Sequence, residues 1–258
     1  MREPWRADPL AWIHRVEARA IARELGASLK TYPFSGRVLL RLSDPVMRRA
    51  VKEIQAPYCG PGSAALERCY DKYEAHRLVT AAGIDAPRTF LASEAGEMQA
   101  PFVLKPRRGS DSIGVRIVRS VPAAKRDAHH VVQELVLGEE ITIAVFRDQV
   151  GAPLRILLPP GAPYSFMRKY LFRPRRSVVE ERALSERIRR LASRAARCLG
   201  VDWAARVDLI VETGTGSLRF LECDAAPLVG ANSAFAASFA AAGVERATQL
   251  RWLLRQKA

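Results

Sequence analysis

Two alternating segments on either side of a glycine-containing turn constrain the fold of this chain more than any other feature. In residues 206–212 and 218–224, polar and apolar side chains alternate, which is the period of a β-strand and not of a helix. The residues between them, Thr213 to Gly216, include two glycines, which adopt the positive φ values of a tight turn without strain. The sequence therefore predicts an antiparallel β-hairpin.

The expected register of this hairpin gathers charge on one face. A three-residue loop sets Asp208 opposite Glu222 and Arg206 opposite Asp224, on a face that the alternation also assigns to Phe220. Two unit charges ~4 Å apart interact by about 4 kcal/mol at an effective dielectric constant of about 20, so bare carboxylates there would repel strongly. Mg²⁺ held by carboxylate oxygens removes this repulsion. A solvated acidic face is the alternative, but the apolar residues on the other face favour a buried hairpin with a metal site.

The composition indicates a globular protein without a membrane segment. The 258 residues are enough for one large domain or two to three small ones, and 48% of them are hydrophobic. No apolar run reaches about 18 residues, and the N-terminal segment carries charges throughout, unlike a signal peptide. The four cysteines show no CxxC spacing. We therefore expect a cytoplasmic protein with reduced thiols.

The formal net charge of +14 comes mostly from arginines. They are dispersed along the chain in short groups, such as those at 107–108, 173–176 and 187–190. Nucleic-acid-binding proteins usually concentrate their positive charge in one stripe, with aromatic residues interleaved. The dispersal therefore disfavours nucleic acid as a partner and favours small anionic ligands or an acidic partner.

A second informative stretch joins a predicted strand at 102–106 to another at 115–118. The first strand carries Lys105 near its end, and the connecting loop is rich in Gly, Ser and Asp. The backbone N–H groups of such a loop can face an anion, and the lysine can reach the same anion as a point charge. The GxxxxGK[ST] pattern of a Walker loop is absent. The stretch indicates a phosphate site, with an ordinary flexible hairpin as the alternative.

The rest of the chain alternates between helical and extended patterns. Apolar periodicity and capping residues predict helices at 8–26, from 45 onward, at 63–82 and at 183–199. Further strands are predicted at 37–42, 131–136 and 141–147. The proline-rich, basic segment 159–176 is typical of a long surface loop. This order predicts an α/β protein built from α+β subdomains.

Several motifs, in order, resemble one family. They run from Tyr58 to Phe235 and read YCGPG, DKYEAHRLVTAAGIDAPRT, FVLKPRRGSDSIGV, VVQELVLGEEITIAV, RKY and RVDLIV…FLECDAAP. Together they are similar to the ATP-grasp superfamily, in its D-alanine–D-alanine ligase-like branch. The resemblance implies ATP and Mg²⁺, or Mn²⁺, bound between two subdomains, and a carboxylate activated as an acyl phosphate. It divides the chain into a reduced N-terminal α/β (preATP-grasp-like) domain at 1–62, a central ATP-grasp subdomain with the phosphate loop at 63–138, and a C-terminal subdomain with the metal site at 139–258.

The same resemblance implies a role for each residue that matches a family motif. The residues implied to bind ATP are Lys72, Lys105, Gly109, Ser110, Ser112, Gln133, Glu134, Leu135, Val136, Glu140 and Lys169. Those implied to be catalytic are Arg206, which would stabilise a tetrahedral intermediate, together with Lys169 and Ser112. The implied metal ligands are Asp208, Glu222 and Asp224, and Tyr170 and Ser233 match positions expected to contact the substrate.

The chain also departs from the family pattern. Asp224 stands where an asparagine is usual, Leu228 follows Pro227 where a glycine is common, and Asp111 occupies a position usually held by a small residue. The N-terminal region lacks the Gly-Gly-x-Ser-x-Glu motif that holds the first D-alanine in the true ligases. The resemblance therefore implies ATP and metal sites without implying specificity for D-alanine.

We expect a ligase that joins a small-molecule carboxylate to an amine, with an acidic carrier protein or peptide as another candidate substrate. One alternative is an ATP-grasp phosphotransferase that forms no amide. The other is a non-catalytic RNA- or protein-binding module on a decayed ATP-grasp scaffold, which the net charge of +14 favours and the complete set of charged site residues disfavours. A homodimer is compatible with each of these hypotheses.

Overall fold

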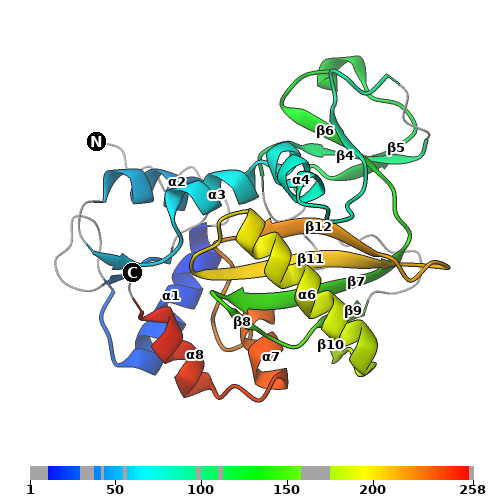
Figure 1. Cartoon of the computed structure of the whole chain (residues 1–258). Helices are drawn as coiled ribbons and strands as arrows, with labels where there is room; N and C mark the ends of the chain where they lie inside the picture. Colours follow the sequence, from blue (N-terminus) through cyan, green and yellow to red (C-terminus); the bar gives the residue numbers. More distant parts are fainter. Residues whose placement is uncertain are drawn as a thin grey trace.

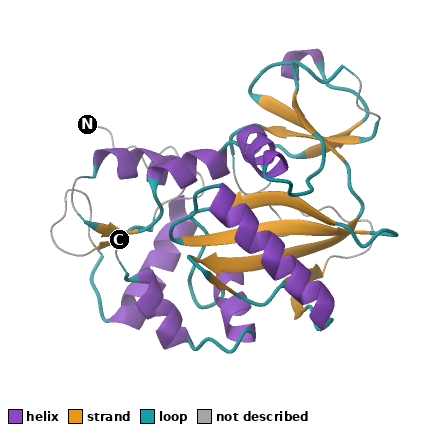
Figure 2. Ribbon diagram, viewed as in Figure 1, coloured by secondary structure: helices purple, strands orange, loops and turns teal. Residues whose placement is uncertain are grey.

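The computed structural model describes residues 11–29, 38–41, 44–54, 57–96, 100–109, 113–157 and 175–255 (Figure 1). They form a two-stranded, a four-stranded and a six-stranded sheet, with helices on both faces of the largest one (Figure 2). The helices are α1 (Ala11–Leu25), α2 (Asp44–Glu53), α3 (Ser63–Tyr70), α4 (Lys72–Ala81), α6 (Arg182–Cys198), α7 (Ala234–Ala241) and α8 (Arg246–Leu253), with a 3₁₀ turn at Ala123–Lys125. In the described part of the chain, no helix combines the length and apolar character that a bilayer crossing needs.

The six-stranded sheet is the centre of the fold. Its strands run β10-β9-β7-β11-β12, and β8 pairs with β7. All of these pairings are antiparallel. The strands are β7 (Gly138–Phe146), β8 (Gln149–Val150), β9 (Leu154–Leu157), β10 (Arg175–Val178), β11 (Ala204–Glu212) and β12 (Leu218–Asp224).

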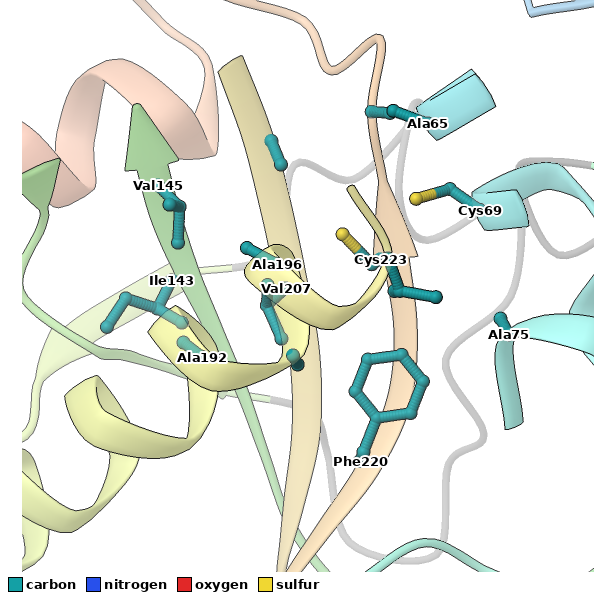
Figure 3. Packing of buried hydrophobic residues seen from close by; sticks show 14 of the residues in the cluster. Ala65, Cys69, Ala75, Ile143, Val145, Ala192, Ala196, Val207, Phe220 and Cys223 are labelled. Atoms are coloured by element: carbon teal, nitrogen blue, oxygen red, sulfur yellow. The ribbon is translucent and has the colours of Figure 1, made fainter. Parts of the chain in front are cut away.

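One face of this sheet carries the main hydrophobic core. Alternate residues of β7 and β11, among them Ile143, Val145 and Val207, pack with Ala192 and Ala196 of α6 (Figure 3). Alanines on the helix allow it to lie close to the strands, where bulkier side chains would hold it away. Helices α3 and α4 contribute to the same core.

The opposite face carries a second core at one end and the polar side chains of the hairpin further along. Phe146 of β7 packs with Trp203, Phe235 and Phe239, beneath helices α7 and α8. Ala204 lies on this face, and so do the residues at every second position after it in β11. The alternation therefore brings Arg206 and Asp208 onto the face that the core leaves uncovered.

The four-stranded sheet, with order β3-β6-β4-β5, is antiparallel and lies apart from the larger sheet (Figure 1). Its strands are β3 (Thr89–Leu91), β4 (Phe102–Pro106), β5 (Arg116–Val118) and β6 (His130–Glu134), and the small parallel sheet pairs β1 (Val38–Leu39) with β2 (Tyr58–Cys59). Helix α4 contacts both β3 and β12, so it connects the two larger sheets. The division into three parts at residues 62 and 138 stays a prediction.

Two predicted elements differ from the structure. The helix expected at 63–82 is two helices, because Asp71 has an extended backbone (φ −89°, ψ 98°) and caps α4 by accepting a hydrogen bond from the Glu74 N–H at 3.2 Å. The loop expected at 159–176 was predicted two residues too long at its end, since Arg175 and Arg176 belong to edge strand β10 and pair with β9. The rest of that loop lies outside the described residues.

Several arginines of α6 serve the fold. The guanidinium groups of Arg187, Arg189 and Arg194 donate to backbone carbonyl oxygens of Gly216 (3.1 Å), Gly151 (2.6 Å) and Ala82 (3.0 Å). Each of these carbonyls lies in a turn or at a helix end, where it lacks a partner within its own element. These three arginines therefore stabilise neighbouring loops against α6 through hydrogen bonds.

Candidate functional site

Arg206 lies among the three carboxylates of the hairpin, as the predicted register requires. Its Nη2 is 2.8 Å from Asp208 Oδ2 and 3.5 Å from Glu222 Oε1, and its Nη1 is 3.5 Å from Asp224 Oδ2. The side chain of Arg206 is only 11% exposed. Burial acts to lower the pKa of this guanidinium, but Asp208 and Asp224 outweigh it and hold the pKa well above its ordinary value. One permanent positive charge thus faces three acidic groups.

The structure contains both predicted residue pairs of the hairpin, but the register that produces them differs from the predicted one. Asp208 does pair with Glu222 and Arg206 with Asp224, but the register shifts after Asp208, so that Leu209 lies opposite Phe220. Leu221 is the extra residue of a β-bulge.

The turn is correspondingly one residue longer than predicted, because the Glu212 N–H donates to the Ser217 carbonyl oxygen at 2.9 Å and leaves four residues in the loop. The longer loop and the bulge offset each other. Phe220 consequently faces the main core, and its predicted place on the face of Glu222 and Asp224 is wrong.

Strand β7 adds two side chains to this face. Thr142 Oγ1 donates to Asp208 Oδ1 at 2.6 Å and so fixes one of the carboxylates. Glu140 pairs with Ile210 of β11, further along the same strand. Burial, followed by the charges of Asp208 and Glu222, raises the pKa of Glu140 to about 7. Glu140 is therefore a buried acidic group within electrostatic range of two of the hairpin carboxylates.

Lys105 reaches the same region from the four-stranded sheet. It lies on β4, is 7% exposed, and its Nζ donates to Gln133 Oε1 at 2.8 Å. Burial and, after it, the charge of Lys72 lower the pKa of Lys105 to about 8, while the charge of Glu222 acts in the opposite direction. The structure thus brings residues of β4, α4 and β12 within electrostatic range of one another.

The first part of the predicted phosphate loop is tied to the start of α4. The backbone N–H of Lys72 donates to the carbonyl oxygen of Arg107 at 2.9 Å, and its ammonium donates to the carbonyl oxygen of Gly109. Asp71 accepts from Arg107 Nε at 2.8 Å and lies 3.0 Å from Arg108 Nη2. Burial acts to raise the pKa of Asp71, but these arginines and the Glu74 N–H hold it below its usual value.

The remaining predicted residues fall in three groups. Glu134 Oε2 lies 3.3 Å from Arg219 Nη2, and Val136 is buried. Ser233 caps α7, because its hydroxyl oxygen accepts a hydrogen bond from the Ala236 N–H at 3.0 Å. Leu135 lies in the short link between β6 and β7. The predicted residues that lie outside the described part of the chain are Ser110, Ser112, Lys169 and Tyr170.

Sequence reasoning missed three side chains that shape this site. His76 and Thr89 contact Gln133, and Thr142 contacts Asp208. A lone histidine within a helix and isolated threonines in strands carry no pattern that marks them. Asp71 lay inside a quoted motif, but its capping role depends on the break between α3 and α4.

Residues 74–255 match the family model described as "D-ala D-ala ligase C-terminus". A D-alanine–D-alanine ligase from Nitrosospira multiformis is 31% identical over 222 residues, which cover 78% of this chain and 71% of that protein. The chain belongs to the D-alanine–D-alanine ligase family. The predicted ATP-grasp fold and carboxylate–amine ligase class are thereby confirmed.

Other relatives agree with this assignment to the D-alanine–D-alanine ligase family. A D-alanine–D-alanine ligase from Pseudomonas putida is 29% identical, covering 78% of this chain and 69% of that protein. The crystal structure of a Bacillus anthracis D-alanine–D-alanine ligase complexed with ATP superposes with a TM-score of 0.74, covering 94% of this chain and 91% of that one, at 19% identity. This structural likeness supports the fold.

Proposed function

We propose that this chain joins a small carboxylate to a small amine and converts ATP to ADP and phosphate. The observation that carries the proposal is the meeting of two oppositely charged sets of side chains. The acidic face of β11–β12 around Arg206 lies within electrostatic range of Lys105, whose ammonium is almost completely buried. A phosphate-binding cation beside an acidic, oxygen-rich face is what phosphoryl transfer requires.

The reaction balances with this chain's own residues in supporting roles. A carboxylate oxygen of the substrate attacks the γ-phosphorus, the bond to the β-phosphate oxygen breaks, and ADP leaves. Lys105 and Lys72 would offset the charge of the transferred group. The amine nitrogen of the second substrate then attacks the acyl carbon, phosphate departs and the nitrogen loses a proton. Arg206 would donate hydrogen bonds to the oxyanion formed at that carbon.

The residues present fit a divalent metal ion in their chemistry. Carboxylate oxygens are the ligands that Mg²⁺ prefers, and Asp208, Glu222 and Asp224 supply them. One guanidinium opposes these three groups, and the charges of Asp208 and Glu222 add to burial in raising the pKa of Glu140. As the described side chains stand, no three acidic, His or Cys groups converge tightly enough to hold a metal, because Arg206 lies between them. Bound Mg²⁺ would supply charge neutralisation to the transferring phosphoryl group.

We propose small amino acids as the substrates, because the relatives are named D-alanine–D-alanine ligases. The proposal does not extend to specificity for D-alanine. The chain departs from the family pattern at Asp224, where asparagine is usual, at Leu228 after Pro227, and in its N-terminal region. An acidic carrier protein has no support from the relatives. A homodimer stays a prediction.

The proposal is tested by incubating the protein with ATP, Mg²⁺ and a panel of D- and L-amino acids, alone and in pairs, and identifying products by mass spectrometry. The expected product is an amide that appears together with ADP and phosphate. Glu222→Gln should abolish it, whereas Glu212→Gln, at the turn end of the same hairpin, should leave it unchanged. A phosphorylated substrate without an amide would instead show a phosphotransferase.

A further inference from the structure

His76 connects the two larger sheets beside the proposed phosphate site. It lies on α4 and is 4% exposed. Its Nε2 is 2.8 Å from the carbonyl oxygen of Leu221, the bulged residue of β12, and 3.0 Å from the side-chain nitrogen of Gln133 on β6. Its Nδ1 is 3.3 Å from Thr89 Oγ1 on β3. One ring therefore contacts the six-stranded sheet and two strands of the four-stranded sheet.

Gln133 extends this contact to Lys105. Its Oε1 accepts from Lys105 Nζ at 2.8 Å, and its Nε2 donates to Thr89 Oγ1 at 2.9 Å. An ammonium group offers only donors, so Lys105 determines which end of the amide faces it. The NH₂ group of Gln133 is consequently directed toward Thr89 and His76.

The ring of His76 cannot satisfy both neighbours of its Nε2 atom at the same time. Burial, followed by the charges of Lys105 and Lys72, lowers the pKa of His76 to about 3, so the ring is neutral at physiological pH and carries one N–H. The Leu221 carbonyl requires a hydrogen on Nε2, whereas the NH₂ of Gln133 requires a lone pair there. With the hydrogen on Nε2 the ring donates to Leu221 and keeps only Thr89 as a partner in the four-stranded sheet, whereas with the hydrogen on Nδ1 it accepts from Gln133 and loses Leu221.

We infer that His76 is a positioning residue that couples the ammonium of Lys105 to the backbone carbonyl preceding Glu222. The inference rests on the proposed function, in which Lys105 binds phosphate and Glu222 binds the metal. When Lys105 turns from Gln133 to a phosphate group, the amide can reverse and offer its oxygen to the ring. Both neighbours of Nε2 are then acceptors, and the tautomer that holds the bulge is favoured. Phosphate binding and the order of the metal-binding strand become linked.

The coupling is tested without nucleotide by following the ring ¹⁵N chemical shifts of His76 between pH 6 and pH 10. Lys105 should lose its proton near pH 8, and the ring, which titrates near 3, should report this step through Gln133. The other charged groups acting on Lys105 are Lys72 and Glu222. Lys105→Met removes the titrating group and should abolish the inflection near pH 8. A flat titration in the wild-type protein, or an inflection that persists in Lys105→Met, would overturn the coupling.

The kinetics of two variants distinguish a positioning role of His76 from a role in which its side chain only fills space. His76→Leu keeps the volume of the side chain but no donor, and should lower kcat about tenfold, the value of one lost hydrogen bond. His76→Gln can again donate to Leu221 and should restore most of kcat, while both variants melt within a few degrees of each other. Equal kcat values for the two variants would contradict the inference. Absence of ATP turnover in the wild type would refute the proposed function and leave the NMR result to decide the coupling.

Discussion

Nucleotide binding by this ligase is predicted to draw a proton from solution onto Lys105. The pKa of the buried ammonium is about 8, against an ordinary value of 10.5. At pH 8 about half of the molecules therefore carry a neutral lysine, and at pH 7 about a tenth. Phosphate oxygens beside Nζ should return the pKa to its ordinary value or above. Binding should then take up about 0.5 proton per ADP at pH 8 and about 0.1 at pH 7.

Isothermal titration calorimetry of ADP binding in two buffers of different ionisation enthalpy measures this uptake directly. Lys105→Arg is the matched control, since arginine stays charged at both pH values and leaves only the protons exchanged by other groups. The difference between the wild type and this variant should be about half a proton at pH 8. Equal uptake in the two proteins would refute the account of Lys105 as a buried, partly neutral phosphate ligand.

Three further predictions follow from the charges of the site. Glu222→Gln should remove Mg²⁺-dependent turnover while the urea midpoint of the apo protein holds or rises, and full activity at low Mg²⁺ would contradict the metal role. Because the folded-state pKa of Glu140 is raised to about 7 from 4.5, its ionisation costs stability as pH rises between these values. Glu140→Gln should accordingly gain about 1 to 3 kcal/mol in urea unfolding at pH 8 and little at pH 4. Duplex DNA and RNA should bind weakly and be released by physiological salt, and tight binding there, independent of ATP, would favour a nucleic-acid-binding module.

The sequence was sufficient for the hairpin and for the grouping of its charged residues. Period-two alternation is a local property, and the two glycines mark the turn, so the two strands followed directly. The pairing of Asp208 with Glu222 was predicted with a loop one residue too short, and it holds because the bulge offsets the longer loop. The bulge at Leu221 could not be predicted, because a bulge is stabilised by distant contacts. Here the contact is with His76, whose Nε2 lies 2.8 Å from the Leu221 carbonyl oxygen although the two residues are 145 positions apart in the chain.

The break between α3 and α4 shows the same limit. Asp71 sits within a continuous helical pattern, and although an aspartate favours a helix cap over a helix interior, one such residue does not outweigh the surrounding pattern. Its salt bridges with Arg107 and Arg108, more than 30 residues later, favour the cap. Lys105 was likewise predicted as a point charge for phosphate, but its lowered pKa depends on how deeply β4 is buried.

Transfer of oxygen from the substrate carboxylate to phosphate tests the central claim most directly. An amino acid labelled with ¹⁸O in its carboxylate, incubated with ATP, Mg²⁺ and an amine acceptor, should pass one ¹⁸O atom to each phosphate released, because the acyl–oxygen bond breaks when the amine attacks. Mass spectrometry measures the ¹⁸O content of the released phosphate. The amount of labelled phosphate should equal the amount of amide formed at each time point. Unlabelled phosphate accompanying the amide would contradict an acyl phosphate intermediate and, with it, the mechanism proposed for this site.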